Sequence, residues 1–181
     1  MAMTIDRLKE LCEGEDLKYF LAPDRPMVTL GFGGSTGRFQ FVIPIELDGR
    51  FLQIRTTGYL SCPASHAHVN TVLTILGALN YQLRMTKFGW DPEDGEITAF
   101  ADVWIEDGDL TQKQFGTLMK STLAAVVVNH KRISGAIETG KDPGEFRPDS
   151  RSKLDELAEK IAAGASGKDD DDDNKDKPLT V

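Results

Sequence analysis

Asp48 and Gly49, near the middle of the chain, constrain the fold more than any other feature. They follow a segment, residues 38–47, in which apolar and polar side chains alternate over the whole length, as in a strand with one buried face. Asp-Gly tolerates positive φ at both positions and therefore favours a two-residue type I′ turn. The pattern and the turn together predict a β-hairpin.

This turn also fixes which residues face each other across the predicted hairpin. Counting outward, Leu47 opposes Arg50 and Ile45 opposes Leu52, so apolar residues meet on one face of the sheet. The same count pairs the side chains of the other face. Its pairs are Val42 with Arg55 and Pro44 with Gln53.

A glycine-rich stretch, GFGGSTGR at residues 31–38, precedes this hairpin and superficially resembles a phosphate-binding loop. It lacks the third glycine of a dinucleotide fingerprint and the Lys-Ser/Thr ending of a P-loop. We therefore interpret it as the connection of another hairpin, between Phe32 and Phe39. That register places Pro44 opposite Met27, at the start of the first strand, where its missing N–H costs no ladder bond.

A further hairpin is predicted around the turn at residues 91–95. Trp90 then faces Ile97 and Phe88 faces Ala99, so that apolar side chains pair again. Phe100 and Trp104 fall on the opposite face of their strand. If helices cover only one side of the sheet, these two aromatic side chains point outward.

Three segments have helical periodicity. The first contains Ile5, Leu8, Leu11 and Cys12 and stops at Gly14. The second follows Ser65 as a candidate N-cap and carries an apolar stripe from Val69 to Leu83. The third opens with the capping box Thr111-x-x-Gln114 and continues to Gly140.

The order helix, three strands, helix, two strands, helix predicts an α+β domain over residues 1–140. We expect an antiparallel sheet of about five strands with helices packed mainly on one face. Residues 141–181 differ in composition and begin with a linker that contains Pro and Gly. We expect one short amphipathic helix after it, with Leu154, Leu157 and Ile161 aligned. The chain then continues as an acidic tail with five consecutive aspartates, Asp169–Asp173. The tail has little to bury, and we predict that it is disordered.

Charge and cysteine content exclude several classes of protein. The net charge is −8 and no basic block is present, which argues against a nucleic-acid or anionic-membrane partner. Two cysteines, Cys12 and Cys62, are too few for a disulfide scaffold. No apolar stretch approaches about 20 residues, and the start has no secretory signal, so we expect a cytoplasmic protein.

Residues 4–140 resemble the YbjN family, whose fold is similar to that of the type III secretion chaperones. The likeness is carried by TIDRLKELCEG, by the FVIPIELDGRFLQIRT hairpin, by residues 68–105 with their Leu-Asn pair and Asp-Gly-Glu turn, and by DLTQKQFGTLMKSTL. The family is described as candidate regulators of sensory transduction, and its chaperone relatives are dimers that hold extended segments of partner proteins. The resemblance implies a homodimer with a protein partner, and it supplies no catalytic residue or cofactor.

One cluster has the residue types of a metal site, namely Cys62, His66 and His68, since thiolate and imidazole suit Zn²⁺. It supplies only three ligands, at a spacing that matches no standard zinc finger. A small metal-dependent enzyme or metal sensor is therefore the alternative hypothesis. We expect no metal, and a helix-entry loop with two partly exposed histidines is the simpler interpretation.

Acid–base catalysis and calcium binding have less support. The acidic side chains gather in two turns, at residues 91–96 and 106–109, where carboxylates usually serve turn formation and helix capping. Neither turn nor the aspartate run has the spacing of an EF-hand. No cofactor is expected.

The remaining candidate for a functional site is the surface of the sheet. Val42, Arg55, Phe100 and Trp104 lie on the sheet face away from the predicted core, and aligned exposed aromatic side chains usually indicate an interface. We therefore predict a non-enzymatic, chaperone-like or regulatory protein-binding module, with these four residues as its partner-binding site. A further hypothesis is that the acidic tail shields a basic site, around Arg50, Arg55, Lys87 or Lys131-Arg132.

Overall fold

The computed structural model describes residues 2–34, 36–106 and 108–144. Its helices are α1 (Ile5–Glu13), α2 (Val69–Gln82) and α3 (Gln112–Thr139), with a short 3₁₀ turn η1 at Leu47–Gly49. Its strands are β1 (Tyr19–Leu21), β2 (Met27–Gly34), β3 (Gly37–Glu46), β4 (Phe51–Thr57), β5 (Leu60–Ser61), β6 (Lys87–Trp90) and β7 (Glu96–Trp104). The predicted α+β class and the antiparallel sheet are confirmed.

The strands form one antiparallel sheet in the order β1-β2-β3-β4-β7, with β5 and β6 also paired to β7. The predicted registers are confirmed at every hairpin. Ile45 faces Leu52, Pro44 faces Met27 and Phe88 faces Ala99. The glycine-rich stretch joins β2 to β3, with Phe32 opposite Phe39, as a hairpin connection.

The Asp48-Gly49 turn has the backbone conformation that its sequence favours. Asp48 has φ 55° and Gly49 has φ 87°, and the Arg50 N–H donates to the Leu47 carbonyl over 3.2 Å. A side chain at Gly49 would collide with the backbone of Met3, which packs over the turn. Glycine is therefore required here both for its conformation and for this close approach.

The sheet among the described residues has seven strands, and the prediction of about five was wrong in number. Strand β1 is a three-residue edge strand, too short to show alternation before Pro23. Strand β5 continues β4 along β7 after an interruption at Gly58, where φ is 58°. Both additions are short pieces at the margins of the predicted hairpins.

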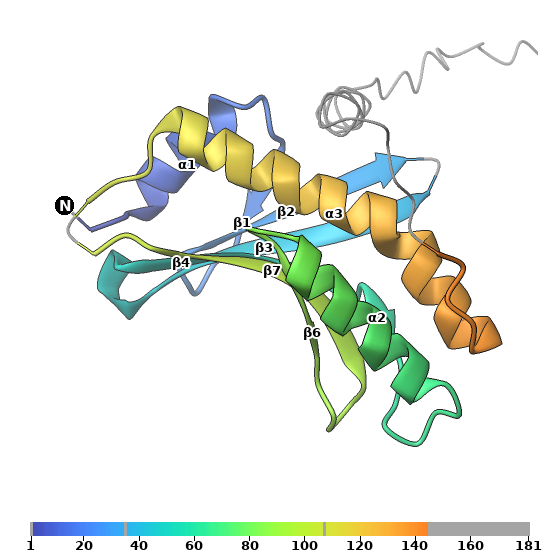
Figure 1. Ribbon diagram of the computed structural model, residues 1–181. Helices are drawn as coiled ribbons and strands as arrows, with labels where there is room; N and C mark the ends of the chain where they lie inside the picture. Colours follow the sequence, from blue (N-terminus) through green and yellow to red (C-terminus); the bar gives the residue numbers. More distant parts are fainter. Residues whose placement is uncertain (1, 35, 107, 145–181) are drawn as a thin grey trace, which may run out of the picture.

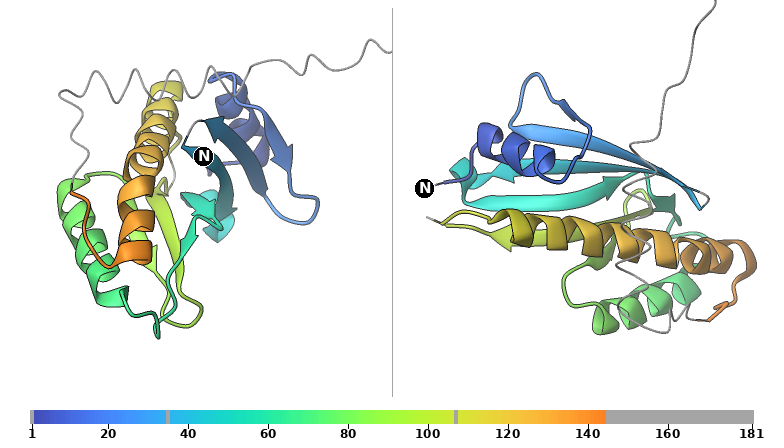
Figure 2. Two further views of the ribbon diagram at one scale, coloured as in Figure 1. Left: turned by 90° about the vertical axis from the view of Figure 1, so that its right-hand side faces the viewer. Right: turned by 90° about the horizontal axis from the view of Figure 1, so that it is seen from above.

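Helices α1 and α3 cover one face of the sheet, and α3 runs along the length of the strands (Figures 1 and 2). The hydrophobic core lies between these helices and the sheet. Its largest fully buried side chains include Phe41, Ile43, Ile54, Phe115 and Ile133. Burying such a side chain stabilises the fold by about 1.5–3 kcal/mol, so this one-sided core is the main source of stability. Helix α2 packs beside α3 and against β6.

The helix boundaries agree with the sequence signals at the start of α3 and at the ends of α1 and α3. Thr111 and Gln114 form the predicted capping box, and Gly140 ends α3 in the left-handed conformation. The assignment of Ser65 as a cap was wrong, because α2 begins only after His68. A backbone turn, in which the His66 N–H donates to the Pro63 carbonyl over 2.8 Å, occupies the intervening residues.

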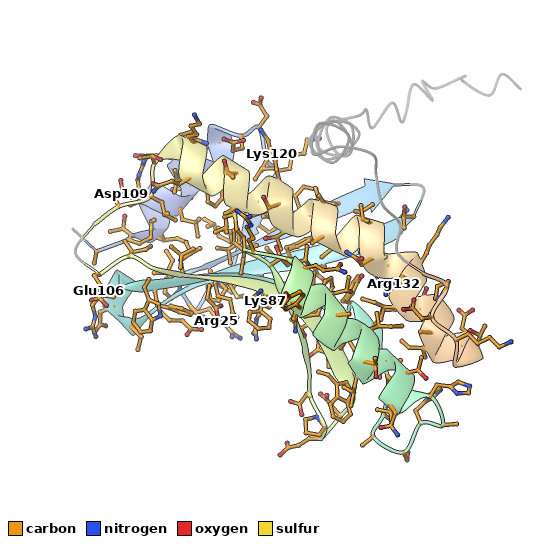
Figure 3. The ribbon with its side chains drawn as sticks, in the orientation of Figure 1. Arg25, Lys87, Glu106, Asp109, Lys120 and Arg132 are labelled. Carbon is orange, nitrogen blue, oxygen red and sulfur yellow. The ribbon has the colours of Figure 1, made fainter. Side chains whose placement is uncertain are left out.

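The chain turns back after α3. Arg132 on α3 donates to both carboxylate oxygens of Asp142, at 2.8 and 2.6 Å, and fixes the residues that follow Gly140 (Figure 3). This pairing holds the pKa of Asp142 below its usual range. The predicted short helix and acidic tail lie outside the described residues, and the division of the chain after residue 140 remains a prediction.

Candidate partner-binding face

The sheet surface opposite α1 and α3, here called the back face, is the candidate functional site. The strand registers place one row of side chains across five strands of this face. The row consists of Phe20, Thr29, Val42, Arg55 and Phe100. Among the described residues, no helix packs over it (Figure 1).

Two aromatic side chains of the back face are largely open to solvent. Trp104 is 63% exposed and its ring lies 5.1 Å from that of Phe51 on β4. Phe20 is 77% exposed, at the opposite edge of the sheet. Phe20 was missed at the sequence level because its three-residue strand gave no periodic signal.

The other two apolar residues of the predicted site are more covered. Phe100 is half-buried and its ring packs over Gly89 of β6, where an added Cβ would lie 3.1 Å from the ring and would require it to shift slightly. Val42 is 7% exposed, so the expectation that it is open to solvent was wrong. Val42 therefore contributes little exposed area to the back face.

Arg55 provides the charge at the centre of this face. It lies between Val42 and Phe100 in the row, is exposed, and makes no hydrogen bond or ion pair with another described residue. The nearby Asp102 carboxylate instead accepts from the Gln53 amide at 2.7 Å. A guanidinium with five free donors between apolar side chains suits a carboxylate carried by a peptide.

The two edges of the sheet differ in accessibility. At β6, the Asn80 side chain from α2 accepts from the Phe88 N–H at 2.7 Å and donates to the Phe88 carbonyl at 2.9 Å. This pair of bonds imitates a neighbouring strand and closes the edge. In the described residues no strand or side chain closes the outer edge of β1 in the same way.

The candidate metal ligands do not come together. Cys62 is fully buried, and burial raises the pKa of its thiol, which favours the protonated form. The rings of His66 and His68 lie 5.5 Å apart, and the His66 Nδ1 accepts from the His68 backbone N–H at 3.2 Å. Across the part of the chain that the structure describes, no three His, Cys, Asp or Glu side chains are arranged to hold an ion.

The acidic turns have the structural roles that the sequence suggests. Asp91 and Asp94 each accept a backbone N–H two residues ahead, at 2.8 Å. Asp109 accepts from the Arg7 guanidinium at 3.0 Å and so joins α1 to the start of α3 (Figure 3). These carboxylates stabilise turns and interhelical contacts.

Solved structures with similar folds define the class of this protein. YbjN from E. coli, described as "a putative transcription regulator", aligns with a TM-score of 0.52 at 13% identity over 70% of this chain and 90% of that one. A chain of the ExsC-ExsE complex aligns with a TM-score of 0.52 at 14% identity over 74% and 97%. The fold is that of the type III secretion chaperone-like proteins.

The sequence narrows this class further. Residues 4–127 match the family described as "YbjN: Putative bacterial sensory transduction regulator", and the chain belongs to the YbjN family. No curated protein matches the sequence. No helix among the described residues is long and apolar enough to span a membrane.

Proposed function

We propose that this protein is a non-enzymatic, cytoplasmic protein-binding module that holds a partner on its back face. The observation that carries the proposal is the row of side chains around Arg55, flanked by Phe20 and Trp104, which no described helix covers. Aromatic side chains and arginine are the residues that most often dominate binding energy at protein interfaces. The similar fold in the ExsC-ExsE complex, a complex of two proteins, supports the same class of function.

Titration with a protein that co-purifies from the source cell tests this proposal. Trp104→Glu places a charge in the centre of an aromatic contact and should weaken binding by about tenfold or more, equivalent to about 1.4 kcal/mol. Thr117→Glu, which adds the same charge at an exposed position of α3, is the matched control and should bind like the wild type. Equal weakening by both variants, or by neither, would argue against the back face as the site.

We further propose that the protein is a homodimer that associates through α2. This helix, residues 69–82, contains no Asp, Glu, Lys, Arg or His, although 28% of the residues in the chain are charged. Its outer side carries Asn70, Thr74, Gly77 and Tyr81, and Tyr81 is 92% exposed. Two copies with net charge −8 repel each other, so an uncharged, self-complementary surface is where they can approach.

Sedimentation equilibrium tests the dimer separately from partner binding. The wild type should show a concentration-dependent dimer, and Tyr81→Glu should be monomeric over the same range because it places two like charges at the symmetric contact. A wild-type protein that stays monomeric at every concentration, or a Tyr81→Glu dimer of unchanged stability, would contradict this part of the proposal.

A further inference from the structure

The structure distinguishes among the basic side chains that an acidic segment could contact. Arg132 is buried and bound by Asp142. Lys87 donates its ammonium group to the carbonyls of Asn80 and Leu83 at the end of α2. Arg50 donates to the Leu47 carbonyl. Of these cations, Arg55 is the one that is exposed, central to the back face and without a bond to another described residue.

The surroundings of Arg55 favour a carboxylate. Two acidic side chains of β7 on the back face are already engaged, since Asp102 accepts from Gln53 and Glu96 accepts from the Gly58 N–H at 3.2 Å. Arg25, in the loop between β1 and β2, lies on the same side of the sheet (Figure 3). Neither Arg25 nor Arg55 has an acidic partner among the described residues.

The chain itself carries a segment with complementary charge. Asp169 to Asp173 are five consecutive carboxylates, and they follow the last described residue, Gly144, by 25 positions. At up to about 3.5 Å per residue this connection exceeds the roughly 42 Å length of α3, so it reaches any part of the back face. Tethering also holds the segment at an effective concentration of about millimolar, which makes even a weak contact populated.

We propose that Asp169–Asp173 bind the back face of the same chain at Arg55, and that a partner must displace them to occupy that face. The acidic segment thereby acts as an autoinhibitor, and this inference rests on the proposed function of the back face. Because the contact is electrostatic and exposed, high salt weakens it, whereas the aromatic contacts of a partner depend less on salt. Partners that pair aromatic contacts with their own carboxylate at Arg55 displace the segment best.

Paramagnetic relaxation of backbone amides in the full-length chain tests the contact without any partner. A nitroxide is attached at Asn174→Cys, and the native Cys12 and Cys62 resist labelling because both are fully buried. At about 0.1 M salt, amides of Thr29, Val42, Arg55 and Phe100 should broaden. At about 1 M salt, where the Debye length falls to about 3 Å, the paramagnetic broadening of these amide resonances should drop by about fivefold or more.

Three variants distinguish a specific contact of the acidic segment at Arg55 from nonspecific attraction to the protein surface. Arg55→Glu, and separately replacement of Asp169–Asp173 by Asn, should abolish the broadening, whereas Lys113→Glu on the exposed side of α3 should leave it unchanged. Broadening that is absent, uniform, or confined to the surfaces of α2 and α3 would overturn the proposal. Broadening seen on unlabelled chains mixed with labelled ones would assign the contact to a second copy, and that result also overturns it.

The partner experiment keeps the two proposals distinguishable. If the acidic segment competes, its replacement by Asn should tighten partner binding to the wild-type back face, by about fivefold to tenfold at low salt. Unchanged partner affinity together with an intact Trp104→Glu effect would reject autoinhibition and leave the binding face in place.

Discussion

At the scale of single residues, the back face shows what can be predicted from alternation and what cannot. The outward placement of Arg55 follows from the period of two and the Asp48-Gly49 turn, and that of Phe100 and Trp104 follows from the period of two in their own hairpin. The burial of Val42 does not follow, because it depends on how neighbouring strands twist and on which side chains lean over it.

His130 illustrates a residue whose environment no sequence pattern indicates. The apolar stripe of α3 includes it, but the structure places its ring 5.2 Å from Phe39 and 5.4 Å from Tyr59. Its Nδ1 is buried and has no hydrogen-bond partner among the described residues. Burial lowers the pKa of His130, because the charged imidazolium loses solvation in this aromatic setting.

This environment makes stability depend on pH in a predictable direction. An unfolded histidine titrates near pH 6.5, so the unfolded chain takes up the proton before folded His130 does. The free energy of unfolding should therefore be at its full value above about pH 6.5 and should decrease as the pH falls below it. Urea denaturation at a series of pH values measures this slope.

Two variants identify the group responsible. His130→Phe should flatten the slope in the mildly acidic range, since the variant cannot take up a proton and its ring packs with Phe39 and Tyr59. His66→Gln, in the loop before α2, should keep the wild-type dependence. A slope that is unchanged in His130→Phe would show that other groups cause it.

At the scale of elements, the hairpins were predictable because two independent signals agreed in each of them. Turn chemistry and alternation agreed on one register for β3 and β4. The turn at residues 91–95 and the apolar pairing of Trp90 with Ile97 likewise agreed on one register for β6 and β7. Strands β1 and β5 were not predictable, because two or three residues show no period and their order comes from pairing with β2 and β7. The late start of α2 likewise reflects a local turn that competes with capping by Ser65.

Helix α2 also determines which edge of the sheet is open, through Asn80. Asn80→Ala removes two hydrogen bonds to Phe88 and should destabilise the protein by about 1–3 kcal/mol. Hydrogen exchange of the Phe88 amide should become faster by the factor that is equivalent to this loss of free energy. Lys113→Ala, at an exposed position of α3, should change the stability by no more than about 0.5 kcal/mol.

The comparison of these two variants decides whether Asn80 closes the edge. If Asn80→Ala and Lys113→Ala have equal effects, the paired bonds contribute nothing beyond ordinary helix propensity. Increased self-association of Asn80→Ala through β6 would be consistent with an edge that has become available for strand pairing.

At the scale of the whole molecule, the one-sided arrangement of helices connects the fold with the proposed function. Because α1 and α3 bury one face of the sheet, the other face must be solvated, covered by a partner, or covered by other parts of the chain (Figures 1 and 2). The α+β class and this asymmetry were predictable from element order. The identity of what covers the back face was not, since nothing in the pattern of one chain specifies its partner.

The most direct test of the central claim uses the two tryptophans of the wild-type protein as probe and internal control. The Trp90 indole N–H donates to the Cys62 carbonyl at 2.8 Å, whereas Trp104 is exposed on the back face. When a co-purified partner is added, the Trp104 indole resonance in a ¹⁵N NMR spectrum should shift and that of Trp90 should stay in place. A complex that forms while the Trp104 resonance remains unchanged would contradict the account.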